Sequence, residues 1–302
     1  MTRHTMRRAC ARTVTGLGLT LALATGGLLT AAGAHAQPVS EGTVSFDGDQ
    51  GDYISGGGSY AYTAGKDQIQ VNGSAGRTTV GLSISGANGD WWSLSLAAPA
   101  GRELQAGTYE GATRYPFNDG GAPGLSHDGN GRGCNTLTGS FTISKITWGP
   151  NGYVEALDAA YEQHCEGGAP ALRGRVHIQN PAPPAALSLG VGVSVEGRAS
   201  ALNGRATVNG KVSCNKPVQV DVSGLVTQVK RNTLIRGPYS ATVACVPGAP
   251  VAWSAEADPT GATPFQSGDV EVKATATAYD SDYRVGVTAS DVKAVHLTRV
   301  KQ

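Results

Sequence analysis

The densest group of side chains able to do chemistry is Glu162-Gln163-His164-Cys165-Glu166. On a β-strand, Glu162, His164 and Glu166 would share one face, where an imidazole between two carboxylates can bind a metal ion or transfer protons. A metal site needs three or four ligands held by outer partners, and this segment has a single His. The competing interpretation is a polar outer face beside a disulfide. Glu162 and His164 are therefore candidate ligand-binding residues, and we predict no metal and no other cofactor.

A second candidate region is the long, Gly-rich and polar segment 115–133, which we expect to form a loop. Loops on a rigid scaffold commonly carry binding residues, although a flexible loop tethered by Cys134 would look the same in sequence. A calcium loop starting at Asp128 would lack its later ligands, and the carboxylates between Asp47 and Asp52 are typical of a solvated turn. The candidate ligand-binding residues in the loop are Tyr115, Asn118, Asp119, His127, Asp128, Asn130 and Arg132.

Trp91 is the third candidate, because strand alternation places its side chain on the other face of the strand from that of its neighbour Trp92. Trp92 shares a parity with Leu94 and Leu96 and is expected to be buried, which leaves Trp91 on the outer face with two serines. An exposed aromatic ring on a β-face can stack against a sugar ring, and Tyr60 and Tyr62 could extend such a platform. The alternative is that this face packs against another part of the chain.

Recognisable catalytic motifs are absent from the sequence. It contains no G-x-S-x-G and no H-E-x-x-H, and the histidines that follow residue 36 are scattered along the chain. A glycosidase that uses two carboxylates stays open, since its acids can lie far apart in sequence. The low aromatic content, 6%, is nevertheless poor for a glycosidase domain. We predict no catalytic residues and favour a protein that is not an enzyme.

Short alternating runs between turn signals indicate that the elements carrying these residues are β-strands. In the first half of the chain the inward set comprises Val80, Leu82, Ile84, Trp92, Leu94, Leu96, Leu172, Val176 and Ile178. Phe141 and Ile143 are out of phase with Ile146 and Trp148, which predicts a bulge near Lys145.

The second half alternates more regularly and predicts five strands. Their inward residues are Ala206, Val208, Val212, Cys214, Val218, Val220, Val222, Tyr239, Ala241, Val243, Cys245, Val251, Trp253, Ala255, Val270, Val272, Ala274 and Ala276. Two cysteines on inward parities, with a Trp to pack nearby, are typical of a β-sandwich with a bridge between its sheets.

The N-terminus predicts an export signal at residues 1–36. Four arginines precede an uncharged apolar stretch from Val14 to Leu29, and Ala34-His35-Ala36 has the small-x-small pattern of a cleavage site. The whole chain has 24 Lys and Arg against 23 Asp and Glu, and the leader holds four of the arginines and no acid. The mature chain is therefore mildly acidic, which argues against nucleic acid as a partner, and no later run predicts a membrane anchor.

Four cysteines follow the leader, and an even number in an exported chain predicts two disulfides. Three pairings are possible. We favour the local pairing, Cys134 with Cys165 and Cys214 with Cys245, because it keeps each bridge within one domain. A zinc site would need closely spaced cysteine pairs, which the sequence lacks.

Several motifs cover most of residues 42–179 and carry a resemblance. They include Gly51-Asp52-Tyr53-Ile54, Asp90-Trp91-Trp92, Arg114-Tyr115-Pro116-Phe117, Gly131-Arg132-Gly133-Cys134-Asn135-Thr136-Leu137-Thr138-Gly139 and Glu162-Gln163-His164-Cys165-Glu166-Gly167-Gly168. Together they resemble a secreted bacterial module of the actinobacterial type, which implies a β-sandwich and brings no assigned activity. Residues 189–300 resemble the immunoglobulin-like domains of exported actinobacterial proteins.

The predicted organisation is all-β, with two β-sandwich domains in tandem at 42–179 and 189–300. The second is immunoglobulin-like, each has one disulfide, and a Pro-rich linker at 180–188 joins them. We expect a secreted, extracellular and non-catalytic binding protein that recognises carbohydrate or cell-envelope material through its first domain. The alternatives are a secreted protein-binding inhibitor or toxin component and a small extracellular hydrolase. The expected partner is an extracellular glycan or protein.

Overall fold

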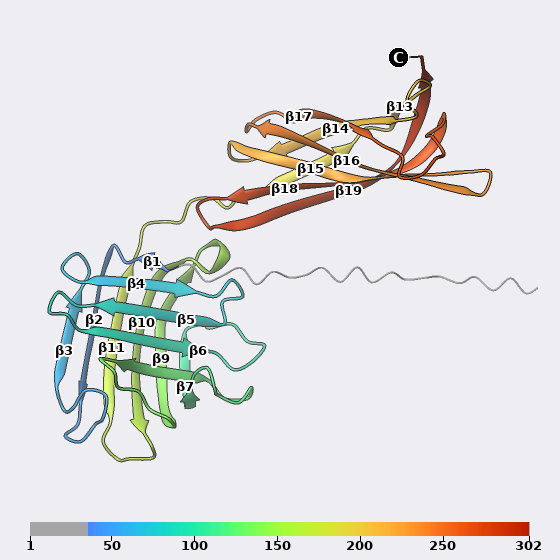
Figure 1. Ribbon diagram of the computed structural model, residues 1–302. Helices are drawn as coiled ribbons and strands as arrows, with labels where there is room; N and C mark the ends of the chain where they lie inside the picture. Colours follow the sequence, from blue (N-terminus) through green and yellow to red (C-terminus); the bar gives the residue numbers. More distant parts are fainter. Residues whose placement is uncertain (1–35, 302) are drawn as a thin grey trace, which may run out of the picture. The chain divides into compact units, whose positions relative to one another are not determined.

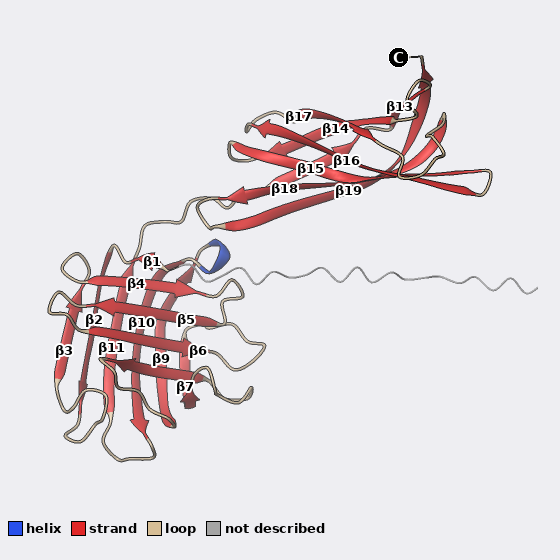
Figure 2. Ribbon diagram, in the orientation of Figure 1, coloured by secondary structure: helices blue, strands red, loops and turns tan. Residues whose placement is uncertain are grey.

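The computed structural model describes residues 36–301 and is all-β, with two separate sheets and a single 3-10 turn at Pro150–Gly152. Residues 37–179 form a curled half-barrel of eleven strands, and residues 189–300 form a sheet structure of eight strands (Figures 1 and 2). The predicted leader, apart from Ala36, lies outside the described residues. No helix in the described part of the chain is long and apolar enough to span a membrane.

The first region has the strand order β1-β4-β5-β6-β8-β7-β9-β10-β11-β2-β3. All neighbouring strands are antiparallel except β7 and β8, which are parallel where Thr113 and Arg114 meet Gly124 and Leu125. The bounds are β1 Gln37–Pro38, β2 Glu41–Gly48, β3 Ser59–Thr63, β4 Gln68–Gly73, β5 Thr79–Ser85, β6 Trp91–Ala97, β7 Gly107–Arg114, β8 Gly124–Gly129, β9 Leu137–Trp148, β10 Val154–Cys165 and β11 Leu172–Gln179.

The core of the first region lies inside the curl of the sheet. In Figure 1, β4, β5 and β6 cross in front of β9, β10 and β11, and apolar residues from both halves form one buried cluster. Burial follows the predicted alternation in β5, β6 and β11. The predicted bulge is confirmed, since Asp158 pairs with Lys145 and Ala159 pairs with Ile143, so that β9 has one extra residue at Ser144. The two halves therefore present outer faces that point away from the shared core.

The second region has the order β12-β14-β13-β19-β18-β15-β16, with β17 paired to β14. Only β13 and β19 are parallel among its described pairs. The bounds are β12 Leu189–Val193, β13 Glu196–Ser200, β14 Ala206–Cys214, β15 Val218–Lys230, β16 Thr233–Cys245, β17 Val251–Ala257, β18 Gly268–Asp280 and β19 Val285–Val300.

Both predicted disulfides are confirmed, with Cys134 joined to Cys165 and Cys214 joined to Cys245. In the second region the bridge links the end of β14 to the end of β16, and the predicted inward residues line a second buried cluster. Trp253 is buried in this cluster and stacks on Tyr239, with ring centroids 5.7 Å apart. Each region thus has its own apolar core and its own covalent bridge.

No strand is present between Asn180 and Ser188. Asn180 is buried and donates a hydrogen bond from Nδ2 to the Val154 carbonyl of the first region. Leu187 is buried in the core of the second region, where its N–H donates to Asp280 Oδ2. Asn180 is therefore bonded to the backbone of the first region, and Leu187 is held by a side chain of the second.

Candidate functional site

Trp91 is 50% exposed at the start of β6, whereas Trp92 is 1% exposed in the core, as the alternation predicts. Strand β6 lies between β5 and β8, so the outward residues of these strands and of β4 form one continuous outer surface. We call this surface the β6 face. It consists of Gln68, Gln70, Asn72, Gly81, Ser83, Ser85, Trp91, Ser93, Ser95, Ser126 and Asp128.

The β6 face is polar but almost uncharged, since Asp128 is its one ionisable residue. Glycine and the short side chains of serine occupy its middle rows, so few side-chain atoms rise above the sheet beside the indole of Trp91. Hydroxyl and amide groups both donate and accept hydrogen bonds, so this surface can pair with a ligand that does the same. The arrangement suits a neutral, polyhydroxylated partner better than a charged one.

A chain of hydrogen bonds fixes the backbone beneath Trp91. The Trp91 N–H donates to Asn130 Oδ1 at 2.9 Å, and the Asn130 N–H donates to the Trp91 carbonyl at 3.0 Å. Asn130 Nδ2 in turn donates to Asp90, whose carboxylate also accepts the Tyr62 hydroxyl. The Tyr62 hydroxyl accepts the indole N–H of Trp92, 2.6 Å away, so the chain reaches the core.

The charge of Asp90 is stabilised within this network. The hydrogen bond from the Tyr62 hydroxyl is the largest of several effects that lower the pKa of the Asp90 carboxyl below its usual value. Burial, followed by the nearby Asp90 carboxylate, raises the pKa of the Tyr62 hydroxyl. An ionised Asp90 and a neutral Tyr62 keep the Trp91 segment in place at neutral pH, so the exposed indole is presented by a rigid support.

The predicted extension of the platform by Tyr60 and Tyr62 is wrong. Tyr62 is buried, and Tyr60 stacks on Phe46 with ring centroids 4.8 Å apart. Their rings face the core because the curl of the sheet buries this parity, while the Tyr62 hydroxyl is satisfied by Asp90.

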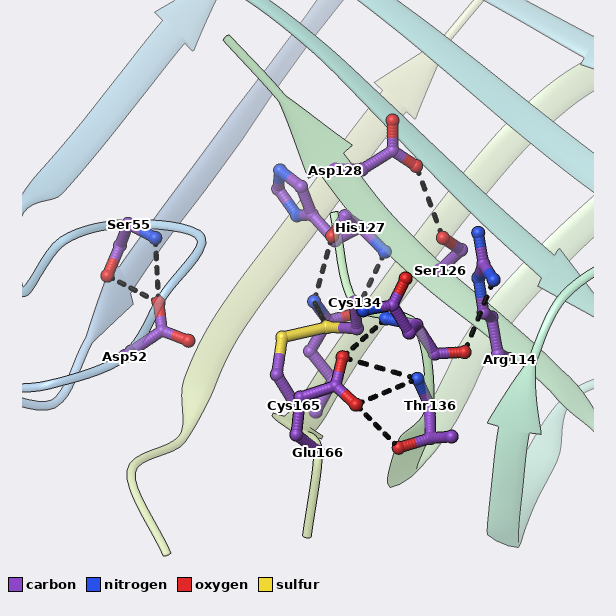
Figure 3. Close-up of a disulfide and its surroundings, with 12 residues drawn as sticks. Asp52, Ser55, Arg114, Ser126, His127, Asp128, Cys134, Thr136, Cys165 and Glu166 are labelled. Carbon is purple, nitrogen blue, oxygen red and sulfur yellow. Dashed lines mark hydrogen bonds between the residues drawn. A yellow bond between two sulfur atoms is a disulfide. The ribbon is translucent and has the colours of Figure 1, made fainter. Parts of the chain in front are cut away.

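The expectation of one long loop at 115–133 is also wrong, because β8 runs through it. His127 lies on the inward side of β8 and is buried, so it is not a surface ligand (Figure 3). Its Nδ1 contacts the Tyr161 hydroxyl, and its backbone N–H and C=O are both bonded by the buried Gln163 side chain at 2.8 Å. Its Nε2 is buried with no hydrogen-bond partner among residues 36–301, and burial lowers the pKa of His127 to about 3.

Asp128, the next residue, points to the opposite side of β8 and lies across from Ser93 on the β6 face. Its carboxylate accepts a hydrogen bond from the Ser126 hydroxyl, 3.2 Å away (Figure 3). Burial raises the pKa of the Asp128 carboxyl, while the Ser126 hydroxyl and the Arg114 guanidinium oppose that shift. Asp128 is therefore a partly buried carboxyl group at the edge of the face, with the guanidinium of Arg114 nearby.

The other candidates in this segment have mainly structural contacts. Asp119 Oδ1 accepts two backbone N–H groups of its own turn, and Asn118 Nδ2 donates to the Ala122 carbonyl. Tyr115 is half-buried beside Gly124, and the Arg132 guanidinium lies 5.5 Å from the ring centroid of Trp92.

Two residues near the face were missed in the sequence. Phe117 is 73% exposed in the turn that precedes β8, and the Arg114 guanidinium lies 4.9 Å from its ring centroid. Arg114 also donates to the Asn135 carbonyl and contributes charge near Asp128 (Figure 3). Both residues belong to the motif Arg114-Tyr115-Pro116-Phe117, in which the sequence pattern singles out Tyr115 alone as a ligand-binding candidate.

Glu162 and His164 lie on β10, which β7 and β9 separate from the β6 face in the sheet order. His164 Nε2 is 3.2 Å from Glu162 Oε1, and this contact is the largest cause that lowers the pKa of Glu162. Arg173 binds Glu162 at 2.8 Å and Asp49 at 3.0 Å.

Glu166 does not share the face of Glu162 and His164, because the chain leaves the strand after Cys165 with a positive φ of 53° at Glu166. Its carboxylate accepts the Asn135 N–H and the Thr136 hydroxyl instead (Figure 3). Across residues 36–301, no group of three or more His, Cys, Asp or Glu side chains is arranged to hold a metal ion.

The structure thus brings Trp91, Asp128 and Asn130 together, places Glu162 and His164 elsewhere, and buries His127. No protein-family model matches the chain, and no curated protein shows significant similarity to it. The assignment of a site therefore depends on the geometry of the chain itself.

Proposed function

We propose that the chain is a secreted, non-catalytic binding protein whose first region recognises carbohydrate or cell-envelope material through the β6 face. The observation that carries the proposal is the half-exposed indole of Trp91 on a rigid hydrogen-bonded support, beside rows of uncharged hydroxyl and amide side chains. The C–H groups of a sugar ring stack on an indole, and its hydroxyl groups match donors and acceptors in the adjacent rows.

Three features support the extracellular part of the proposal. The disulfides, one in each region, are typical of chains that fold in an oxidising compartment. The predicted leader at 1–36 accounts for export, and the resemblance of residues 42–179 points to a secreted β-sandwich module. In this proposal residues 189–300 are an immunoglobulin-like β-sandwich that acts as a spacer or docking module, joined through the linker at 180–188.

The proposal is tested with a glycan array and with pull-down of the mature chain on purified cell envelopes. Trp91→Ala should weaken binding by about 2 kcal/mol, or roughly thirtyfold, because a central aromatic anchor contributes that much to an interface. Tyr279→Ala is the matched control, since Tyr279 is 57% exposed in the second region and should leave binding unchanged.

Retention of full binding by Trp91→Ala would refute the role of the β6 face. If the chain instead captures a protein, and Trp91→Ala weakens that binding to the same extent, the β6 face is a binding site for protein and not for glycan. The chain would then belong to the alternative class of secreted protein-binding proteins.

A further inference from the structure

A hollow of about 450 Å3 lies on the outer surface of β9, β10, β11 and β2, far from β6 in the sheet order. Its floor is low because Ser45, Ser140 and Ala160 are short, and its charged lining residues are Asp47, Glu162, Arg173 and Arg175. The strand register explains the hollow. Arg175 of β11 pairs with Ala160 of β10 and with Ser45 of β2, so this arginine has a small residue on each side of it. The volume is within the range of small-ligand sites.

The charged residues around the hollow differ in their partners. Arg173 is held by Asp49 and by Glu162, and His177 of the same strand contacts Asp158 at 2.5 Å. By contrast, neither Arg175 nor Asp47 forms an ion pair or a side-chain hydrogen bond with any residue in the range 36–301. The hollow therefore has one guanidinium, that of Arg175, and one carboxylate, that of Asp47, which are both available to bond a ligand.

We infer that this hollow is a second sugar-binding site, in which Arg175 and Asp47 bind neighbouring hydroxyl groups of one sugar ring. A guanidinium donates to hydroxyl oxygens, and a carboxylate accepts from hydroxyl protons, so a vicinal diol satisfies both at once. The hydroxyls of Ser45 and Ser140 can bond further ring substituents. An anionic ligand would meet Asp47 and an ammonium ligand would meet two arginines, so the balance of charge selects a neutral polyol.

The inference rests on the proposed function only for the class of ligand, since the site shares no residue with the β6 face. The core of the half-barrel lies between the two surfaces, so one chain would hold two glycan segments on faces that point away from each other. Two sites on one module raise the affinity for a polymer above that for a single sugar unit. The partner class that fits is therefore a polymeric glycan with neutral sugars.

The test is a titration of the 15N-labelled mature chain with methyl glucoside, methyl galactoside and methyl N-acetylglucosaminide, followed by NMR. At least one sugar should produce saturable shifts at the Arg175 side chain and at the Ala160 and Ser45 amides. Arg175→Gln should weaken this binding about tenfold or more, because charge-assisted hydrogen bonds are lost. Arg198→Gln, which alters an exposed arginine of β13 in the second region, is the matched control.

Galacturonic acid and glucosamine are included to test the charge argument, and both should bind more weakly than the neutral sugars. Trp91→Ala should leave the shifts at Arg175 intact, so failure at the hollow and failure at the β6 face are distinguishable. Absence of saturable shifts with every neutral sugar, unchanged affinity in Arg175→Gln, or preference for either charged sugar would overturn the inference.

Discussion

The buried imidazole of His127 should make the first region lose stability in acid. Its pKa is lowered from 6.5 to about 3 by burial, and no group in the described part of the chain forms a hydrogen bond with its Nε2. The unfolded chain takes up a proton as the pH falls through 6.5, but the folded chain takes it up only near pH 3. The stability is therefore complete above about pH 6.5 and is lost progressively between these two values.

The magnitude follows from the two pKa values. At pH 5 the pH lies about 1.5 units below the pKa of His127 in the unfolded chain. Protonation therefore stabilises the unfolded state by about 2 kcal/mol, at 1.36 kcal/mol per unit. A loss of this size is a large part of the stability of a single domain. His127→Gln removes the titrating group, so the stability difference between the wild type and this variant should shift by about 2 kcal/mol between pH 7.5 and pH 5.

The assay is urea unfolding followed by the amide NMR signals of β8 and β10, which report the first region alone. Tyr161→Phe is the control, because it removes the hydroxyl that contacts His127 and leaves the imidazole in place. It should lower stability equally at both pH values. A stability difference for His127→Gln that is the same at pH 7.5 and pH 5, or a pH effect of equal size in Tyr161→Phe, would refute the reasoning.

Three further variants test the packing at Gly174, the first disulfide and a buried hydrogen bond. Gly174→Ala should destabilise the first region by about 2 kcal/mol, because a Cβ there would lie 2.1 Å from the Tyr161 ring, and urea unfolding measures the loss. Replacing both Cys134 and Cys165 with Ala should lower the unfolding midpoint and cost about 3–4 kcal/mol, since the bridge spans 31 residues. Asp280→Ala should destabilise the second region by about 1–3 kcal/mol, because the buried N–H of Leu187 loses its acceptor, and thermal unfolding measures the loss.

Each of these predictions has a result that contradicts it. Gly192→Ala is the control for the glycine substitution, because a Cβ there meets nothing within 4 Å, and equal losses at both positions would exclude a steric cause. Unchanged stability of the double cysteine variant under oxidising conditions would show that the bridge contributes little. An Asp280→Ala variant as stable as the wild type would mean that the stranded groups find other partners.

Alternation predicted the buried faces of the fold well because a strand's period of two leaves little choice once one side is apolar. The inward positions of Trp92 and Leu94 and the bulge beside Lys145 all follow from this rule. The disulfides followed from an even number of cysteines at local spacings. These features depend on local sequence and on the exclusion of water from one face.

The sequence signal failed where long-range contacts decide the structure. Strand β8 has glycine at both ends and His127 and Asp128 within it, so it resembles a loop in sequence. Its antiparallel pairing with β6 and its short parallel pairing with β7 make it a strand. The ring of Tyr62 is inward because the curl of the sheet buries its parity, and Asp90, distant in sequence, accepts a hydrogen bond from its hydroxyl. Glu166 leaves the strand through a positive φ that alternation does not encode.

The most direct test of the central claim is the indole N–H NMR signal of Trp91 during titration with the glycan that the mature chain binds most strongly on the array. We expect a saturable shift of this signal, whereas the signals of the buried indoles of Trp92 and Trp253 should not shift. The dissociation constant from the shift should match that from pull-down and should rise about thirtyfold in Trp91→Ala. A bound glycan that leaves the Trp91 signal in place would contradict the assignment of the β6 face.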